Sequence, residues 1–234
     1  MQNNNIPVIT IDGPSGVGKG TISHLLAKHF NWNYLDSGAL YRITAYAATS
    51  KDIDFDNISK YEEEIAQLAL ALNIEFSNDG EVLLDKINIQ LFIRTESCGN
   101  KASIIAALPT VRAALLQKQK DFQSTPGLIA DGRDMGTVVF PNALHKIFLT
   151  ASAEERGKRR YKQLQENYNN ARVPGSPDLL SISLDRIIAE VKQRDERDIN
   201  RKISPLIPAK DAIIIDTSNI SVDQVFNKIL LLCK

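Results

Sequence analysis

The chain has 234 residues, of which 43% are hydrophobic and 24% are charged. This composition is ordinary for a soluble globular protein with one α/β core and room for inserts. Lys plus Arg and Asp plus Glu number 28 each, so the chain lacks the basic excess that is typical of a nucleic-acid binder.

Neither the cysteines nor the apolar runs indicate a secreted or membrane protein. Cys98 and Cys233 form no disulfide framework and no metal-binding motif. No run of about 18 apolar residues could span a bilayer. Residues 1–5 lack the basic region and apolar stretch of a signal peptide. We therefore expect a cytoplasmic protein.

A glycine-rich loop follows the first predicted strand, Val8–Ile11, and precedes apolar residues at helical spacing. The loop reads Gly13-Pro14-Ser15-Gly16-Val17-Gly18-Lys19-Gly20-Thr21. Glycines in such a place let several backbone N–H groups converge on one anion, and the helix N-terminus adds positive charge. The spacing Gly-x-x-x-x-Gly-Lys is the phosphate-loop fingerprint, and its lysine reaches the outer phosphates.

One position departs from the general fingerprint. Most phosphate loops carry Ser or Thr directly after the lysine, whereas Gly20 stands there and the hydroxyl comes one residue later, at Thr21. A Gly-Lys-Gly-Thr ending resembles the nucleoside monophosphate kinases, in which phosphates and water hold most of the magnesium.

The next segments predict a second strand and an insert. A short strand at 33–36 precedes a helix from 39 toward 48, on which Tyr41 and Arg42 lie. These two residues could be an amphipathic pair on a helix surface, but their place after the carboxyl end of a strand favours a ligand contact. A helix over 59–72 comes before a hairpin with its turn at 78–80 and a third strand at 87–89. No long helix separates these strands, so we predict an antiparallel insert over 61–100.

The chain then returns to the α/β pattern. Helical periodicity resumes at 104–107 and 111–122, and a buried strand over 128–131 ends in Asp131. A carboxylate at that point can order magnesium and its waters, although it could instead cap the next turn. Strands at 145–149 and 212–216, with a helix to Leu232, complete an alternation that predicts a parallel sheet with right-handed crossovers.

Two basic segments, 156–162 and 192–202, flank a stretch of loop-forming residues at 167–177. Arginine dominates both segments, and its guanidinium suits bidentate phosphate recognition. Beside a phosphate loop, this pattern favours two helices that act as a movable flap. The alternative is a pair of surface helices with solvated charges.

Four segments of the chain together resemble the bacterial cytidylate (CMP) kinases of the P-loop NTPase superfamily, and the resemblance covers nearly the whole chain. They are 13–21, 36–42, 129–141 and 194–201, of which the run Gly132-Arg133-Asp134-Met135-Gly136 is much more specific than the phosphate loop. The resemblance implies an α/β P-loop kinase core with a parallel sheet flanked by helices, a small antiparallel β insert and a helical lid.

The resemblance also implies a division of the chain. The parts are the core over 1–60 with the phosphate loop and the CMP phosphate site, the monophosphate-binding insert over 61–100, the middle of the core over 101–156, the lid with its flanking helices over 157–200, and the end of the core over 201–234. The stretch from about 168 to 183 is longer than the short lid of the family, so the lid's outer shape departs from the family pattern.

The activity that the resemblance implies is transfer of the γ-phosphoryl group of ATP to CMP and dCMP, in pyrimidine nucleotide metabolism. The implied cofactor is Mg²⁺, held mainly by phosphates and water, with Thr21 and Asp131 as candidate contacts of its water shell. The implied partners are the nucleotides alone, without nucleic acid or membrane, and the protein is expected to be a monomer.

The resemblance assigns roles residue by residue. The loop 13–21 would hold ATP's phosphates, together with Arg159 and Arg160 from the lid. The catalytic residues would be Lys19, Asp131, Arg133, Arg159 and Arg160. The CMP contacts would be Arg42 and Arg133 at the phosphate, Ser37, Ser103, Arg112 and Asp134 at the base, Arg194 and Asp198 at the ribose, Arg201 nearby, and Tyr41. Asp134 could instead only cap the glycine-rich turn.

Two other functions remain open from the sequence. The first is a kinase for another monophosphate such as UMP, and the second is a regulatory switch that hydrolyses a nucleotide. A GTPase switch would typically carry an Asn-Lys-x-Asp guanine motif, which this sequence lacks. An arginine only donates and an ionised aspartate only accepts, so Arg112 and Asp134 together would match cytosine and mismatch uracil.

Overall fold

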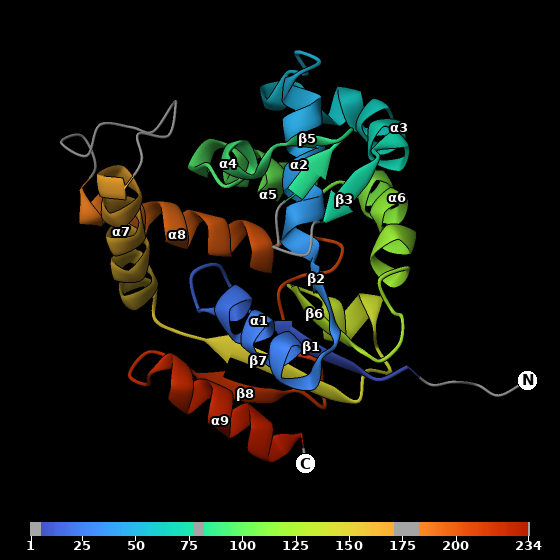
Figure 1. Cartoon of the computed structure of the whole chain (residues 1–234). Coiled ribbons are helices and arrows are strands. Elements are labelled where there is room, and N and C mark those ends of the chain that lie inside the picture. The colour runs from blue at the N-terminus through green and yellow to red at the C-terminus, as the bar shows by residue number, and fades with distance from the viewer. Residues whose placement is uncertain (1–5, 77–81, 171–182, 234) are drawn as a thin grey trace, which may run out of the picture. The chain divides into compact units, whose positions relative to one another are not determined.

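The computed structural model describes residues 6–76, 82–170 and 183–233, which form two compact units (Figure 1). The core unit comprises Met1–Asp36 with Gln119–Lys234, and the insert unit comprises Ser37–Lys118. The predicted turn at 78–80 and the connection at 171–182 lie outside the described residues. The insert unit contains the predicted 61–100 segment and extends beyond it on both sides.

A five-stranded parallel sheet organises the core unit, as predicted. Its strands are β1 (Val8–Asp12), β2 (Asn33–Asp36), β6 (Leu128–Gly132), β7 (His145–Thr150) and β8 (Ile213–Asp216), in the spatial order β2-β6-β1-β7-β8. Asp12, the last residue of β1, lies opposite Gly132, the last residue of β6, and opposite Phe148, two residues before the end of β7. Since ligands of open α/β sheets bind at this edge, the topology brings the phosphate loop and the segment after β6 to one place.

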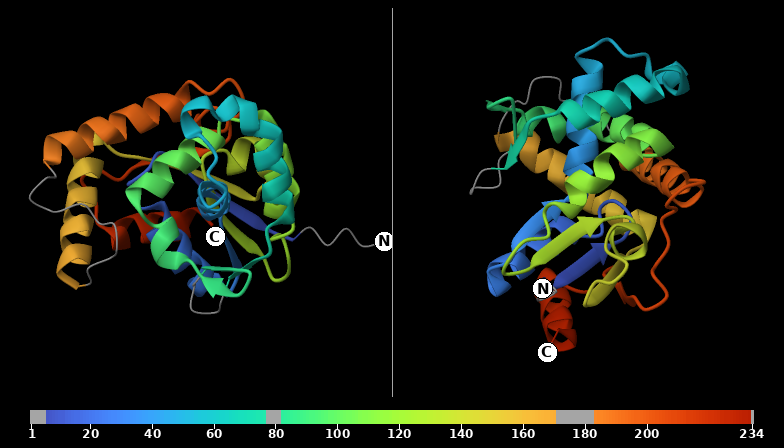
Figure 2. Two further views of the ribbon diagram at one scale, coloured as in Figure 1. Left: turned by 90° about the horizontal axis from the view of Figure 1, so that it is seen from above. Right: turned by 90° about the vertical axis from the view of Figure 1, so that its right-hand side faces the viewer.

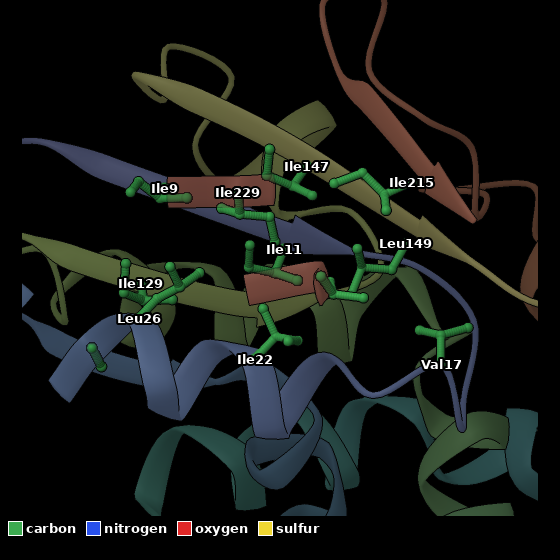
Figure 3. Close-up of a cluster of buried hydrophobic side chains, with 12 residues drawn as sticks. Ile9, Ile11, Val17, Ile22, Leu26, Ile129, Ile147, Leu149, Ile215 and Ile229 are labelled. Atoms are coloured by element: carbon green, nitrogen blue, oxygen red, sulfur yellow. The ribbon is translucent and has the colours of Figure 1, made fainter. Parts of the chain in front are cut away.

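Two helices, α1 (Lys19–Phe30) and α9 (Val222–Leu232), cover one face of the sheet. Alternate strand residues such as Ile9 and Ile11 point to this face and meet Ile22, Leu26 and Ile229 of the helices (Figure 3). Each such side chain is almost fully buried, which contributes about 1.5–3 kcal/mol per residue. This apolar layer fixes the start of α1 against the end of β1.

The other face of the sheet is covered in part by a short helix, η2 (Met135–Val139). A Cβ atom added to Gly136 would lie 2.9 Å from Oγ1 of Thr10 and 3.3 Å from the Lys146 side chain. Only glycine therefore permits η2 to approach β1 and β7 this closely.

Two long helices, α7 (Ala153–Asn170) and α8 (Leu184–Ile199), correspond to the predicted basic pair and pack against each other (Figure 2). At their crossing a Cβ atom on Gly157 would lie 2.5 Å from Cγ1 of Ile188, so a side chain cannot fit there. Ion pairs join them as well, including Lys192 with Glu154 at 2.8 Å. Of the helices in the described parts of the chain, none has the length and apolarity to cross a bilayer.

The insert unit is helical with a small antiparallel sheet in the order β3-β4-β5, as predicted. Its elements are α2 (Ser37–Thr49), η1 (Phe55–Tyr61), α3 (Glu62–Ala71), β3 (Ile74–Phe76), β4 (Val82–Leu84), β5 (Ile87–Asn88), α4 (Gln90–Ile93), α5 (Glu96–Ile105) and α6 (Pro109–Lys120). The helix predicted from 59 begins at Glu62, after a 3₁₀ stretch that Asp54 caps by accepting the N–H of Asp56. The helical run predicted at 104–107 overlaps only the last two residues of α5, which begins at Glu96 and ends at Ile105.

Candidate active site

The phosphate loop lies between β1 and α1, and its backbone admits only glycine at critical points. A Cβ atom on Gly13 would lie 2.2 Å from the carbonyl oxygen of Leu149, and Gly18 has a φ of 94° directly before α1. The first turn of α1 carries no acidic residue. The N–H groups at this helix start therefore meet no carboxylate from that turn, and they form a site that favours an anion.

The side chain of Lys19 bonds back to the backbone of the phosphate loop. Its Nζ donates a hydrogen bond to the carbonyl oxygen of Pro14 at 2.8 Å, and the residue is only 7% exposed. Burial lowers the pKa of Lys19 to about 7, and the positive charge of Arg133 acts in the same direction, against the opposing charge of Asp131. The ammonium is thus short of negative partners, which a bound phosphate chain would supply.

Asp131 lies beside the start of α1. It is buried, the Tyr34 hydroxyl donates to its Oδ2 at 3.5 Å, and a Cβ atom on Gly20 would lie 3.6 Å from the same oxygen. Thr21 is exposed on the first turn of α1. Within residues 6–76, 82–170 and 183–233, no three acidic, histidine or cysteine side chains gather into a metal cage.

Asp12, the last residue of β1, has a role that the sequence did not reveal. Its two carboxylate oxygens accept the backbone N–H groups of Met135 and Gly136 at 2.8 Å each, and burial raises its pKa to about 7. Within the part of the chain that the structure describes, Asp12 therefore caps the start of η2. The side chain of Asp134, the residue before η2, makes no capping hydrogen bond to this helix. The turn-capping alternative for Asp134 is thus wrong. The sequence feature that could have pointed to this role of Asp12 is an acidic residue directly before the phosphate loop.

Three predicted CMP residues, Arg133, Arg194 and Arg201, lie around the buried carboxylate of a fourth, Asp198. Arg133 Nε donates to Asp198 Oδ2 at 3.1 Å, and Arg201 Nε donates to the Asp198 carbonyl oxygen at 3.2 Å. Burial raises the pKa of Asp198, but the guanidinium groups of Arg133, Arg201 and Arg194 outweigh that effect and hold it below its usual value. The cluster carries a positive excess that suits an anionic ligand.

The two lid arginines of α7 differ in their surroundings. Arg159 donates to the carbonyl oxygen of Thr217 at 2.5 Å and to its hydroxyl at 3.2 Å, which holds it at the carboxyl end of β8. Arg160 donates to the Gln163 side chain at 2.8 Å on the helix surface. Their neighbour Arg156, which the sequence placed in the basic segment without a role, is 4% exposed.

The predicted residues of the insert unit form two contacts of their own. Arg42 Nη1 donates to the carbonyl oxygens of Ile93 and Thr95 at 2.7 and 3.1 Å, and a Cβ atom on Gly99 would lie 2.6 Å from its Nη2. The Arg112 guanidinium carbon lies 5.7 Å from the centre of the Tyr41 ring. Tyr41, Arg112, Ser37 and Ser103 are all buried, so Tyr41 is no surface residue of an amphipathic helix.

The sheet order, the loop between β1 and α1 and the arginines around it define an α/β kinase of the phosphate-loop class. The chain belongs to the cytidylate kinase family, because residues 9–234 match the family model described as Cytidylate kinase. It is 51% identical over 229 residues to the cytidylate kinase of Shewanella denitrificans, covering 96% of this chain and 94% of that one. It is 52% identical over 234 residues to that of Pseudomonas fluorescens, covering 98% and 96%.

Proposed function

We propose that the protein transfers the γ-phosphoryl group of ATP to CMP, giving ADP and CDP. Membership of the cytidylate kinase family supports this activity, that of an ATP-dependent phosphotransferase with a phosphate group as acceptor. The structural observation that carries it is the glycine loop with buried Lys19, whose electrostatic neighbours include Arg133 and Arg194. A site of this kind holds two anionic nucleotides against their mutual repulsion.

The chemistry asks more for positioning and charge neutralisation than for a covalent catalyst. The CMP phosphate is itself the nucleophile, so no strong general base is needed. Each ion pair at about 4 Å, in an effective dielectric of about 20, supplies about 4 kcal/mol before desolvation. Lys19 and the arginines of the core unit are the groups that neutralise the charge that develops on the transferred phosphoryl group.

We assign ATP to the loop 13–21, with Arg159 and Arg160 acting from α7. The contact of Arg159 with Thr217 supports this, since Thr217 also bonds to Val17 of the loop. We assign the CMP phosphate to Arg42 and Arg133, and the ribose to Arg194 and Asp198 with Arg201 alongside. The base would meet Ser37, Tyr41, Ser103, Arg112 and Asp134.

Mg²⁺ would accompany ATP and neutralise part of its phosphate charge. Asp131, beside Gly20 at the start of α1, and the exposed Thr21 would contact its water shell. Asp131 would orient these waters through its carboxylate while Tyr34 donates to the same group. We further propose that dCMP is an acceptor and that the protein works as a cytoplasmic monomer without nucleic-acid or membrane partners.

An ADP-release assay across CMP, dCMP, UMP and AMP tests the function. CMP should stimulate ADP release strongly, and dCMP should as well. Stimulation by UMP alone would identify a kinase for that monophosphate. Release that no monophosphate increases would identify a hydrolytic switch.

The Asp134→Asn variant tests the assignment of the base. An amide can donate to O4 of uracil, so we expect a lower kcat/KM for CMP and a CMP/UMP ratio that narrows at least about tenfold, or about 1.4 kcal/mol. Asp223→Asn, an exposed position in the first turn of α9, is the matched control and should keep the ratio. A folded Asp134→Asn variant with an unaltered ratio would remove Asp134 from the base site.

A further inference from the structure

Two side chains outside the phosphate loop hold backbone carbonyl groups of the loop. Arg156 Nη1 donates to the carbonyl oxygen of Ser15 at 3.1 Å, and the Thr217 hydroxyl donates to that of Val17 at 3.1 Å. Both side chains are buried, at 4% and 2% exposure. The donors of these hydrogen bonds are therefore largely shielded from water, and a turn of either carbonyl group would break a hydrogen bond made by a buried side chain.

A trans peptide is planar, with its C=O and N–H groups pointing in opposite directions. Fixing the carbonyl of Ser15 therefore fixes the N–H of Gly16, and fixing that of Val17 fixes the N–H of Gly18. Both N–H groups point away from the donors that hold the carbonyls. We propose that Arg156 and Thr217 are positioning residues that orient the loop amides of Gly16 and Gly18 toward the phosphates of ATP.

Arg156 is itself held rigidly, which its proposed role requires. Two of its nitrogens bond the two carboxylate oxygens of Asp195 on α8, and Nε donates to the carbonyl oxygen of Ala151 at 3.0 Å. A Cβ atom on Gly16 would lie 3.2 Å from Cβ of Arg156, so the loop and α7 are in close contact. The planar guanidinium thereby transmits the position of α7 and α8 to the Ser15 peptide.

Thr217 is oriented in a similar way. Its N–H donates to the carbonyl oxygen of Thr150 at 2.8 Å, which anchors the residue at the end of β7. Its hydroxyl accepts from Arg159 Nη1 at 3.2 Å and lies 3.1 Å from both the Val17 and the Thr150 carbonyl oxygens. Because a hydroxyl has one proton, donation from Arg159 to the oxygen directs that proton toward the carbonyl groups. Both residues that hold the loop are thus linked to α7, since Arg156 lies on this helix and Thr217 is bonded to Arg159 of the same helix.

The experiment compares Thr217→Val, which removes the hydroxyl at nearly constant volume, with Thr217→Ser, which keeps it. Binding of inorganic tripolyphosphate and of ATP is measured by calorimetry, beside the KM for CMP and a thermal melt. The loss of one such hydrogen bond should weaken binding of both phosphate ligands about three- to tenfold in the valine variant. The serine variant should stay within about twofold of the wild type, and the KM for CMP should change little in either.

Arg156→Lys provides a second variant that keeps the positive charge. A single ammonium cannot bond Asp195 at two oxygens and also reach Ser15, so tripolyphosphate and ATP should again bind more weakly. This variant carries the test if Thr217→Val does not fold.

The proposal is overturned if Thr217→Val and Arg156→Lys bind tripolyphosphate as tightly as the wild type. It is also overturned if the serine variant weakens binding as much as the valine variant does, or if CMP and ATP are affected equally. The inference rests on the assignment of ATP to the loop, and that assignment fails separately if the wild-type protein binds neither tripolyphosphate nor ATP.

Discussion

The lowered pKa of Lys19 predicts that ATP binding takes up a proton. In the nucleotide-free protein, burial and then the charge of Arg133 lower this pKa to about 7. A bound triphosphate places several negative charges beside the ammonium, which favours the charged form and raises the pKa again. Above neutral pH the free protein is therefore mostly uncharged at Lys19, and the ATP complex is mostly charged.

The size of the effect follows from the pKa. With a free pKa of about 7, about a tenth of the lysines carry the proton at about pH 8, and nearly all do once the pKa returns toward its ordinary value near 10.4. Binding should then take up about 0.9 proton at about pH 8, about 0.5 at about pH 7 and little at about pH 6. The uptake rises with pH because only the free protein loses the proton in this range.

Calorimetry in buffers of different ionisation enthalpy measures this uptake directly. The binding enthalpy of ATP without CMP should vary with the buffer at about pH 8, because the buffer supplies the proton. Lys19→Arg is the matched control, since arginine stays charged throughout. This variant still contains Asp12 and therefore retains any uptake or release of a proton by that carboxyl group. A wild-type protein with the same buffer dependence as Lys19→Arg would refute the reasoning.

Two further predictions concern the neighbours of the loop. The carboxyl of Asp12 has its pKa raised from 3.8 to about 7 by burial, so the folded state holds this proton more tightly than the unfolded state, and the stabilising contribution is lost as pH rises through that window. The free energy of unfolding of the wild type, measured relative to Asp12→Asn in urea titrations, should therefore fall between about pH 4 and about pH 7. A relative rise over this range would contradict the prediction, because it would show that the two N–H groups stabilise the Asp12 carboxylate by more than burial destabilises it. Arg160→Ala should lower kcat by about 10³ if the residue acts as an arginine finger, whereas unchanged kcat in Arg159→Ala, Arg160→Ala and the double variant would leave both as structural or solvated charges.

The strands and the phosphate loop could be predicted because their signals are local. β1 and β6 are short apolar runs that end at glycine-rich turns, and such runs have few alternatives. Helix α5 could not be predicted with its bounds, because Ser97, Gly99 and Asn100 are poor helix formers. Tertiary packing stabilises α5. For example, Gly99 has no side chain and therefore leaves room for the Arg42 guanidinium beside the helix. Packing of this kind cannot be read from spacing along one segment.

The supporting residues of the site were missed for a related reason. Thr217 and Val17 are hydrogen bonded across 200 positions of the chain, and Arg156 bonds to Ser15 across 141. A lone threonine after a strand, or one arginine among several, gives no local signal of such a bond. The residues predicted to contact ligand lie in recognisable sequence motifs. The residues that orient the loop can be identified only after folding has brought distant segments of the chain together.

The order of strands in the sheet has a consequence for synthesis on the ribosome. β1 emerges first, but its neighbours β6 and β7 start at Leu128 and His145, more than 100 residues later. At about 5–20 residues per second, the apolar β1 segment waits on the order of ten seconds for any partner. During that interval the nascent chain exposes an unpaired, aggregation-prone strand next to the glycine loop. Residues 37–118, which form a compact unit of their own, are synthesised during this interval. Of the five strands of this sheet, β1 is thus made first and stays unpaired until β6 is complete.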